Sequence, residues 1–330
     1  MSLLSSIPSP SFNSFDIGPL SLNIYGLAIA CGVIAAVWLF GKRLEERNAG
    51  TTDDASSIAV WAVIAGVIGA RLYHVVTDWD RFTDNYAAIP KLWEGGLGIP
   101  GGLAAGIPVG LLLAKRKGIS MSMAATCAAP AIPLAQAIGR LGNYFNQELY
   151  GKATDLPWAL EIDDAHLLVG FASGTTFHPT FLYELLWSLA LCGVLLWIDR
   201  KWRPGLGQLM AMYIAGYGLG RFWVEGLRID RADELAGLRW NQWVAIAMVV
   251  GGSIALAVMR RNPILEEIDP FDDGDESVTT ALDNGDLGDG GENPTADGEV
   301  VNDADNAAAD TDDADPLDTD LEPAIADPDD

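Results

Sequence analysis

The stretch Gly139–Gly151 reads GRLGNYFNQELYG, and it ends a long apolar run by gathering an arginine, two asparagines, a glutamine and a glutamate. In a loop surrounded by water these side chains would be ordinary. Beside a helix that spans a membrane they are costly, and polar residues in such places usually serve a function. The stretch therefore predicts a membrane protein with a functional site at the end of this helix.

The charge of the chain divides it into two parts. Of its 330 residues 50% are hydrophobic, and the formal net charge is −25. Residues 263–330 contain 25 of the 45 acidic residues and neither Lys nor Arg, so residues 1–262 hold 20 acidic and 20 basic residues. We predict a near-neutral membrane domain over residues 1–262. Residues 263–330 have few large apolar side chains, and we predict a disordered acidic tail in the cytoplasm.

Seven apolar windows are long enough for membrane-spanning helices, which need roughly 20 mostly apolar residues. The fourth window should kink because it contains Pro130 and Pro133. The predicted fold is therefore an all-α polytopic membrane protein with seven transmembrane helices. The predicted spans are Leu20–Phe40, Ser57–Val76, Gly98–Ala114, Met121–Leu141, Thr180–Ile198, Gln208–Gly226 and Asn241–Met259.

Basic residues in the loops predict the orientation. Eleven of them follow the first, third, fifth and seventh spans, and six lie in the loops on the other side. Because cytoplasmic loops carry an excess of Lys and Arg, we predict the N-terminus outside and the C-terminus in the cytoplasm. The three remaining bases, Arg71, Arg140 and Arg221, fall within helices near their outer ends. Charged residues inside spans usually mark functional sites, here in the outer half of the membrane.

Metal and nucleotide chemistry find little support. Cys31, Cys127 and Cys192 lie far apart in apolar runs, so we predict that they are small buried hydrophobic residues. His74 and His166 have no neighbours at metal-ligand spacing, and no HExxH, GxSxG, phosphate-loop or CxxC pattern occurs. We expect no metal, no organic cofactor and no nucleic-acid partner.

The first polar cluster is the stretch quoted above. Arg140 and Asn143 share a helix face if the helix continues through Gly142. A guanidinium group suits a phosphate because it donates two parallel charge-assisted hydrogen bonds, and Asn143 and Asn146 can hold hydroxyl or phosphate oxygens. The alternative is that Arg140 only reaches the membrane surface or pairs with Glu148.

The second cluster lies on the predicted sixth span. Four polar residues recur there at helical spacing, namely Tyr217, Arg221, Glu225 and Arg228. On one stripe they predict a helix that faces a polar cavity instead of lipid. The alternative is an Arg221–Glu225 ion pair that only joins helices.

The third cluster opens the predicted fifth span, where Pro179 suits the first helical turn. His178 is either a hydrogen-bonded structural group or a base. An unpaired Glu184 in an apolar helix would be costly, which indicates a partner or a function. Tyr25, in the first predicted span, is by itself more typical of an interfacial residue.

Four stretches of the chain resemble prolipoprotein diacylglyceryl transferases. They are GRLGNYFNQELYG at 139–151, HPTFLYE at 178–184, GYGLGRFWVEGLR at 216–228 and WEGGLGIPGGL at 93–103. Their order also matches, and the resemblance covers roughly residues 15–260. It implies a multi-pass enzyme of the bacterial plasma (inner) membrane. It implies transfer of the diacylglyceryl group of phosphatidylglycerol to the lipobox cysteine of a prolipoprotein signal peptide, the first step of lipoprotein maturation, without a metal or cofactor.

The resemblance also implies roles for individual residues. Arg140 matches the family's phosphatidylglycerol-binding arginine, and Arg221 matches a second essential arginine. Glu148, Glu225 and His178 complete the candidate catalytic residues. The other candidate phosphatidylglycerol-binding residues are Asn143, Asn146, Gly151, Tyr25, Tyr217, Arg228, Tyr183 and Glu184.

One departure from the family pattern concerns the base. Many members carry His at the position of Pro100, and that His has been proposed to accept a proton. Proline cannot transfer a proton, so either the His is dispensable or another group of this chain does the work. The candidates are Glu148, Glu225 and His178, in no firm order.

Two other protein classes compete with this interpretation. A transporter or channel predicts polar residues across the whole membrane depth, whereas here they gather in the outer half. A membrane scaffold whose acidic tail recruits basic partners would leave the three polar clusters unexplained.

Overall fold

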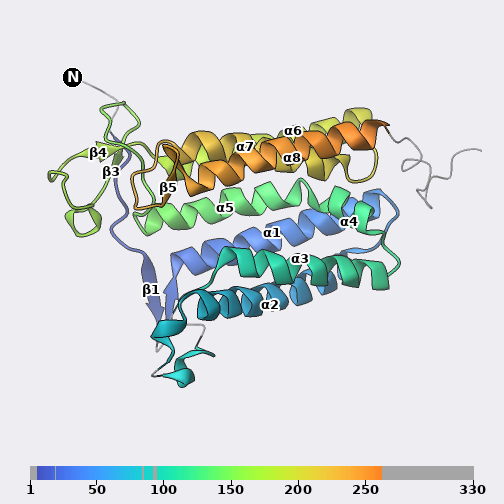
Figure 1. The fold of residues 1–330 in the computed structure, drawn as a ribbon, viewed down its shortest axis with the longest axis horizontal. Coiled ribbons are helices and arrows are strands. Elements are labelled where there is room, and N and C mark those ends of the chain that lie inside the picture. Colours follow the sequence, from blue (N-terminus) through green and yellow to red (C-terminus); the bar gives the residue numbers. More distant parts are fainter. Residues whose placement is uncertain (1–5, 19, 84, 92–94, 262–330) are drawn as a thin grey trace, which may run out of the picture. The chain divides into compact units, whose positions relative to one another are not determined.

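The computed structural model describes residues 6–261, except residues 19, 84 and 92–94. The predicted tail, residues 263–330, and Trp93 and Glu94 of one family stretch lie outside the described residues. The described part is mostly helical, and its long helices run side by side (Figure 1). The helices are α1 (Ile24–Glu46), α2 (Thr52–Thr77), α3 (Ile99–Arg116), α4 (Met121–Ala128), α5 (Ala131–Phe145), α6 (Thr180–Trp202), α7 (Gln208–Glu225) and α8 (Trp240–Arg261).

Four of these helices, α1, α2, α6 and α8, are long and apolar enough to cross a membrane. α4 and α5 together provide a fifth candidate, because they qualify as one span bent by 42°. α3 and α7, with 18 residues each, are not among the candidates. The prediction of a multi-pass helical membrane protein is thus confirmed, and the prediction of seven spans is met only in part.

Large apolar side chains cover the outside of the helices. Ile34 of α1 is 69% exposed, Ile68 of α2 is 53% exposed and Ile254 of α8 is 58% exposed. Soluble proteins rarely expose extended apolar patches, whereas lipid acyl chains would cover them. Cys31 shares the outward face of α1 and is exposed, so its predicted burial was wrong. Cys127 and Cys192 are buried, as predicted.

The two 18-residue helices pack closely on longer neighbours, α3 on α2 and α7 on α8. A Cβ atom added to Gly69 of α2 would lie 2.5 Å from the carbonyl oxygen of Gly101 of α3. A Cβ atom on Gly218 of α7 would lie 2.8 Å from the carbonyl oxygen of Ala245 of α8. Small residues allow such close backbone approach between membrane helices.

The kink predicted in the fourth span is a full break. α4 ends at Ala128, and α5 begins at Ala131 with Pro130 as its N-cap. Pro130 has no N–H to donate and its ring obstructs the preceding turn, so the helix is interrupted there. Pro133 lies in the first turn of α5, where the missing N–H costs little. α5 is therefore a separate helix that ends in the polar stretch.

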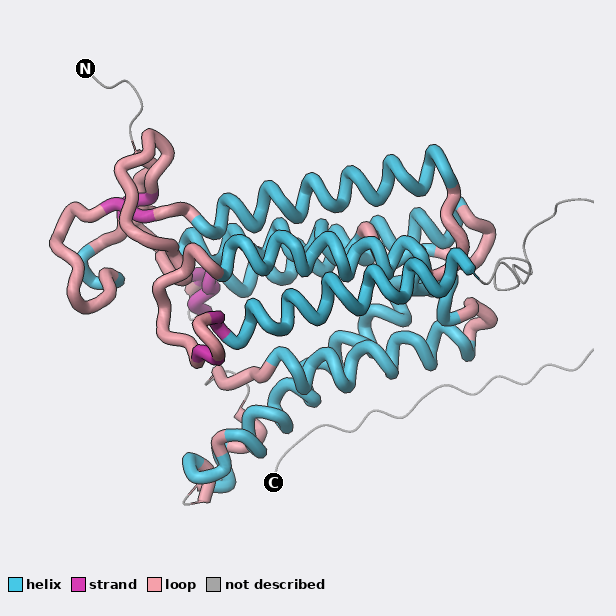
Figure 2. Tube along the Cα trace, turned by 45° about the horizontal axis from the view of Figure 1, so that its top comes forward, coloured by secondary structure: helices cyan, strands magenta, loops and turns pink. Residues whose placement is uncertain are grey.

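Short strands lie at one end of the helices (Figure 2). β1 (Ser14–Ile17) pairs with β2 (Leu20–Asn23) before α1, so the prediction that the first span begins at Leu20 was wrong. The helix begins after Asn23, whose side chain accepts a hydrogen bond from the Tyr25 N–H and caps it. The other pairs are β3 (Leu160–Glu161) with β4 (Thr176–Phe177) and β5 (Glu234–Leu235) with β6 (Leu238–Arg239).

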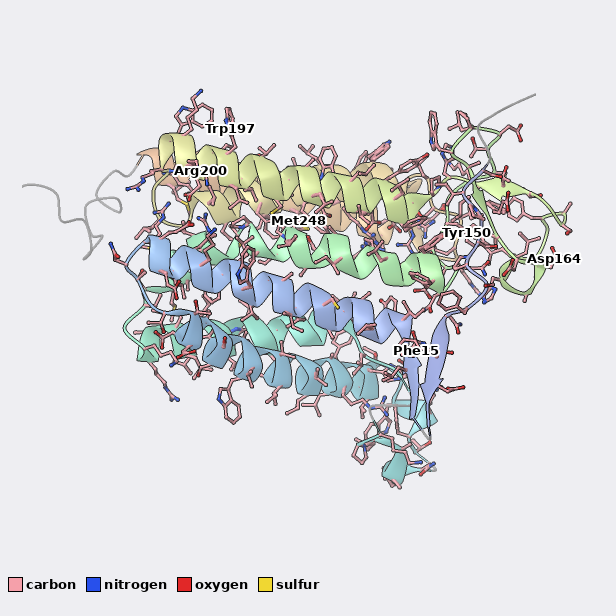
Figure 3. All side chains as sticks on the ribbon, turned by 180° about the vertical axis from the view of Figure 1, so that it is seen from behind. Phe15, Tyr150, Asp164, Trp197, Arg200 and Met248 are labelled. Carbon is pink, nitrogen blue, oxygen red and sulfur yellow. The ribbon has the colours of Figure 1, made fainter. Side chains whose placement is uncertain are left out.

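A buried ion pair lies at the end of α1 away from these strands. Arg43 is 3% exposed and pairs with Asp199 of α6 over 2.9 Å, and Arg47 contacts the same carboxylate. Leu44 and Cys127 pack in the apolar core beside it. Figure 3 shows that Trp197 and Arg200, which flank Asp199 in the chain, lie at the end opposite to Phe15 and Tyr150.

Candidate active site

The polar end of α5 supplies the first part of the site. The helix continues to Phe145, so Arg140 and Asn143 lie on one face as predicted, and Arg140 Nη1 donates a hydrogen bond to Asn143 Oδ1 over 3.1 Å. Asn143 is 4% exposed, and its Nδ2 donates to Glu148 Oε1 over 2.7 Å. Arg140 thus reaches Glu148 through Asn143, and its ion pair is with a different carboxylate.

That carboxylate belongs to Glu184, which lies near the start of α6 and is almost completely buried. Glu184 Oε2 pairs with Arg140 Nη2, and Glu184 Oε1 lies 2.9 Å from Arg221 Nη1. Three helices, α5, α6 and α7, therefore bring two arginines to a single carboxylate. The high cost of an unpaired charge at this position is avoided, because both oxygens have a cationic partner.

Glu225, the last residue of α7, is the most deeply buried carboxylate of the site, with no exposed surface. Its Oε2 lies 2.8 Å from Arg221 Nη2, and its Oε1 lies 2.9 Å from Arg239 Nε. The Arg221–Glu225 ion pair therefore exists, but Arg221 uses its other terminal nitrogen to contact Glu184. Arg221 is thus part of a larger ion-pair network, and its role is not limited to the pair with Glu225.

One predicted feature of the second cluster was wrong. α7 ends at Glu225 with Gly226 as its C-cap, so Arg228 lies beyond the helix and not on the stripe with Tyr217 and Arg221. The chain nevertheless returns Arg228 to the site, with its Nη1 at 3.6 Å from Glu225 Oε2.

Two residues of the network, Arg239 and Asp230, were missed by sequence reasoning. The sequence places Arg239 in an outer loop, yet it is 8% exposed and pairs with Asp230 over 3.0 Å as well as with Glu225. Asp230 also accepts a hydrogen bond from Arg228 Nε over 2.7 Å. The available signal was an acid between two arginines in one short loop. No helical periodicity joins these positions, so only the turn between α7 and α8 brings them together.

Asp230 lies outside the helices, and its ionisation depends on these partners. Burial opposes its negative charge, but the hydrogen bond and charge of Arg228, together with Arg239, hold the pKa of Asp230 below its ordinary value. Burial likewise opposes the charge of Arg228, yet its acidic partners raise the pKa of Arg228 above the ordinary value. The two side chains therefore form a fixed, charged support for Arg239 and Glu225.

Three other predicted residues lie around the network. Tyr25 of α1 packs its ring against Gly142, where an added Cβ atom would collide with the ring. Tyr217 lies one turn before Arg221 on α7, and both residues line a small void next to Glu184. Asn146 is the C-cap of α5, and within the described residues no hydrogen bond joins its side chain to the arginines.

Residues of the third cluster divide between two places. His178 Nδ1 lies 3.1 Å from the Tyr183 hydroxyl, and Trp158 Nε1 donates to the same hydroxyl over 3.0 Å. These side chains form part of an open groove of about 490 Å³, whereas Glu184 belongs to the arginine network. The groove is lined by Trp158, His178, Leu182, Tyr183, Leu186, Trp223 and Leu227.

Gly151 joins three segments around the site. Its N–H donates to the His178 carbonyl over 2.9 Å, and it forms a β-bridge with Arg228. An added Cβ atom would lie 2.8 Å from His178 Cβ and 3.1 Å from the carbonyl oxygen of Leu227. Gly151 therefore lets the loop after α5 pack against the end of α7 and the start of α6.

Accessibility distinguishes the four arginines of the network. The side chains of Arg140 and Arg221 are 21% and 16% exposed, whereas those of Arg228 and Arg239 are 8% and 10% exposed. Arg140 and Arg221 are therefore the more exposed pair of the four. Within the described residues no group of three or more His, Cys, Asp or Glu is placed to hold a metal ion.

Comparison with known proteins identifies the family of this chain. The family model of prolipoprotein diacylglyceryl transferase matches residues 13–258, which include every residue of the network. The chain belongs to this family. The resemblance noted from four short stretches of sequence is thus confirmed over most of the chain.

Individual relatives agree with the family match. A phosphatidylglycerol–prolipoprotein diacylglyceryl transferase of Frankia alni is 47% identical over 272 residues, which cover 81% of this chain and 71% of the relative. The transferase of the same name from Cutibacterium acnes is 46% identical over 78% of this chain and 87% of its own length. Transferase 1 of Streptomyces coelicolor is 48% identical over 74% of this chain and 71% of its own length.

Proposed function

We propose that this chain transfers the diacylglyceryl group of phosphatidylglycerol to the lipobox cysteine of prolipoproteins, the first step of bacterial lipoprotein maturation. The family match and the activity named for the relatives support this reaction. Residues 1–262 would form the catalytic membrane domain, and residues 263–330 an acidic cytoplasmic appendage. Both substrates of this reaction lie in the membrane, because one is a lipid of the bilayer and the other carries a signal peptide that inserts into it.

We also infer seven spans in the bacterial plasma membrane, with the N-terminus outside. α3 and α7 would be the additional spans. A helix of 18 residues is about 27 Å long, close to the roughly 30 Å hydrocarbon core. Their glycine-mediated packing on α2 and α8 supports this inference. The excess of Lys and Arg in the loops away from the arginine network supports the orientation.

One observation carries the assignment of the site: Arg140 and Arg221 converge on one anionic group, the carboxylate of Glu184. A point held by two guanidinium groups at a helix end suits the phosphate of a lipid headgroup. Arg140 and Arg221 are accordingly the proposed phosphate-binding pair, with Asn143 orienting Arg140. Tyr25 and Tyr217 would border the bound lipid.

The proposed reaction exchanges two bonds at one carbon of the lipid. The sulfur of the cysteine attacks the glycerol carbon that bears the phosphate, a C–S bond forms, and the C–O bond breaks with its electron pair going to the phosphate oxygen. The products are a thioether and glycerol phosphate, and the thiol proton passes to a base. A thiol with a pKa of about 8.5 is already partly ionised at neutral pH, so the main task is to stabilise charge on the leaving phosphate.

The structure favours some of the candidate bases over others. Glu225 has no exposed surface and contacts three arginines, so a proton on it would leave several buried cations without their partner. Glu148 has a single described hydrogen-bond partner, Asn143, at the edge of the network. His178 lines the open groove with its Nδ1 held by Tyr183. We therefore propose Glu148 or His178 as the base.

Purified protein tests the proposed activity directly. It is incubated with phosphatidylglycerol vesicles and a lipobox peptide, and the peptide is examined by mass spectrometry. The expected result is a mass gain of one diacylglyceryl group on cysteine. A peptide with serine in place of cysteine, and vesicles of phosphatidylcholine, are the controls and should give no product. No mass gain with the cysteine peptide would contradict the proposed function.

A further inference from the structure

Glu184 occupies the position at which a bound anion would contact Arg140 and Arg221. Its two oxygens face one arginine each, and the residue is only 7% exposed. The carboxylate and a phosphate offer guanidinium groups the same kind of partner, two oxygens that accept parallel hydrogen bonds. In this structure a side chain of the protein therefore fills the site.

The hydrogen-bond donors of the two accessible arginines are already used by carboxylates. The ion-paired and hydrogen-bonded cluster contains four guanidinium groups and four carboxylates. A phosphate can therefore contact both Arg140 and Arg221 only if a carboxylate gives up its contacts with them. Glu184 is the carboxylate that contacts both. The members are Arg140, Arg221, Arg228, Arg239, Glu148, Glu184, Glu225 and Asp230.

Two hydroxyl groups lie close to the Glu184 side chain. A void of about 10 Å³, enough for one water-sized group, is bordered by Glu184 and Arg221 together with Ser188 and Tyr217. Ser188 lies one turn after Glu184 on α6, and Tyr217 lies one turn before Arg221 on α7. Both hydroxyl groups are able to donate hydrogen bonds to a carboxylate.

We propose that Glu184 is an internal counter-anion that the phosphate of the lipid displaces from Arg140 and Arg221. Displaced, its carboxylate turns toward Ser188 and Tyr217. After the transfer it returns to the arginines and helps to expel glycerol phosphate. This inference rests on the proposed function, and it makes Glu184 a competitor of the lipid phosphate instead of a ligand of the lipid.

The variant Glu184→Gln separates these roles, because an amide has nearly the same shape but no charge. The KM for phosphatidylglycerol, the kcat, and the inhibition constant of added glycerol phosphate are measured for the purified full-length chain. We expect KM and the inhibition constant to fall about tenfold each, since a charged competitor is lost, and kcat to fall because product leaves more slowly. Glu46→Gln, an exposed residue at the far end of α1, removes the same charge and should change neither constant.

A shorter acid provides a second test if Glu184→Gln does not fold. In Glu184→Asp the carboxylate no longer spans both arginines, so KM and the inhibition constant should fall in the same direction by a smaller factor. A higher or unchanged KM, with an unchanged inhibition constant, in a folded Glu184 variant would overturn the proposal. Inactive wild-type protein would instead overturn the proposed function, so the two failures are distinguishable.

Discussion

At the scale of the residue, the site depends on how accessible each charge is. Arg228 and Arg239 are deep and are matched by Glu225 and Asp230, and they therefore serve as support. Arg140 and Arg221 have more exposed side chains at the same network. We therefore expect replacement of Arg228 or Arg239 to affect mainly folding, and replacement of Arg140 or Arg221 to affect mainly the reaction.

The first prediction concerns Arg140. Replacing it with alanine should lower the rate of transfer several hundredfold, a loss of about 3–4 kcal/mol, because a positioned cation no longer stabilises the leaving phosphate. The rate is measured with phosphatidylglycerol vesicles and a lipobox peptide. Arg81→Ala, an exposed arginine after α2, is the matched control and should keep the wild-type rate. A near-normal rate for Arg140→Ala would rule out the phosphate-binding role.

At the scale of the element, the last turns of α5 carry two glycines with opposite requirements. A Cβ atom on Gly142 would collide with the ring of Tyr25, whereas nothing lies within 4 Å of a Cβ atom on Gly139. Both positions are helical and three residues apart, so their helix propensities are the same. The difference between the two positions is therefore purely one of packing.

This pair gives the second prediction. Gly139→Ala should raise the stability by up to about 1 kcal/mol, because alanine is the better helix former. Gly142→Ala should displace Tyr25 and lower both the melting temperature and the rate of transfer. Melting temperatures in detergent and transfer rates of the two variants check this. Equal behaviour of the two would show that the Tyr25–Gly142 contact has no importance.

The loop between α5 and α6 gives the third prediction, which concerns pH. Asp163 accepts hydrogen bonds from Gln147 Nε2 over 2.6 Å and from Ser9 Oγ over 2.8 Å, and these bonds hold its pKa below the ordinary value. A lowered pKa means that the stabilisation is complete above the pKa of the unfolded chain, about 3.9, and is lost as the pH falls through the folded-state pKa.

The measurement compares wild type with Asp163→Asn. Limited proteolysis of the loop is followed from pH 6 down to pH 3. The wild-type loop should be better protected at pH 6, and the advantage should shrink as the pH falls below about 4. A difference that does not change with pH would mean that the charge of Asp163 contributes nothing.

At the scale of the whole molecule, charge separates the membrane domain from the acidic tail. The matched family region ends at residue 258, before the tail begins, and the arginine network lies entirely within it. We expect the reaction to need only the lipid, the peptide and the residues of that region. The tail should therefore contribute to something other than the transfer step.

Truncation tests this fourth prediction. A chain that ends at Asn262 should insert into the membrane and transfer the diacylglyceryl group at the wild-type rate. The rate per mole of purified protein is compared with that of the full-length chain. A large loss of rate in a folded truncated protein would assign the tail a part in the reaction.

Local sequence was sufficient for the features that depend on neighbouring residues. The apolar windows predicted most of the helices to within a few residues, because helix formation in a membrane depends on a continuous apolar run. Pro130 and Pro133 predicted a kink in the fourth span for an equally local reason, and the structure has a break at Pro130. The four short stretches predicted the family, because each keeps its characteristic residues close together in the chain.

Tertiary structure alone decided which charges meet. Arg140 finds its partner in Glu184, and Arg239 joins Glu225, although these residues belong to different segments of the chain. The exposure of Cys31 was decided in the same way. The physical reason is that such contacts depend on the rotation and packing of whole helices, which no local periodicity records. The sequence of Gly139–Gly151 thus predicted a polar site by itself, but only the tertiary structure showed that Arg140 pairs with the carboxylate of Glu184.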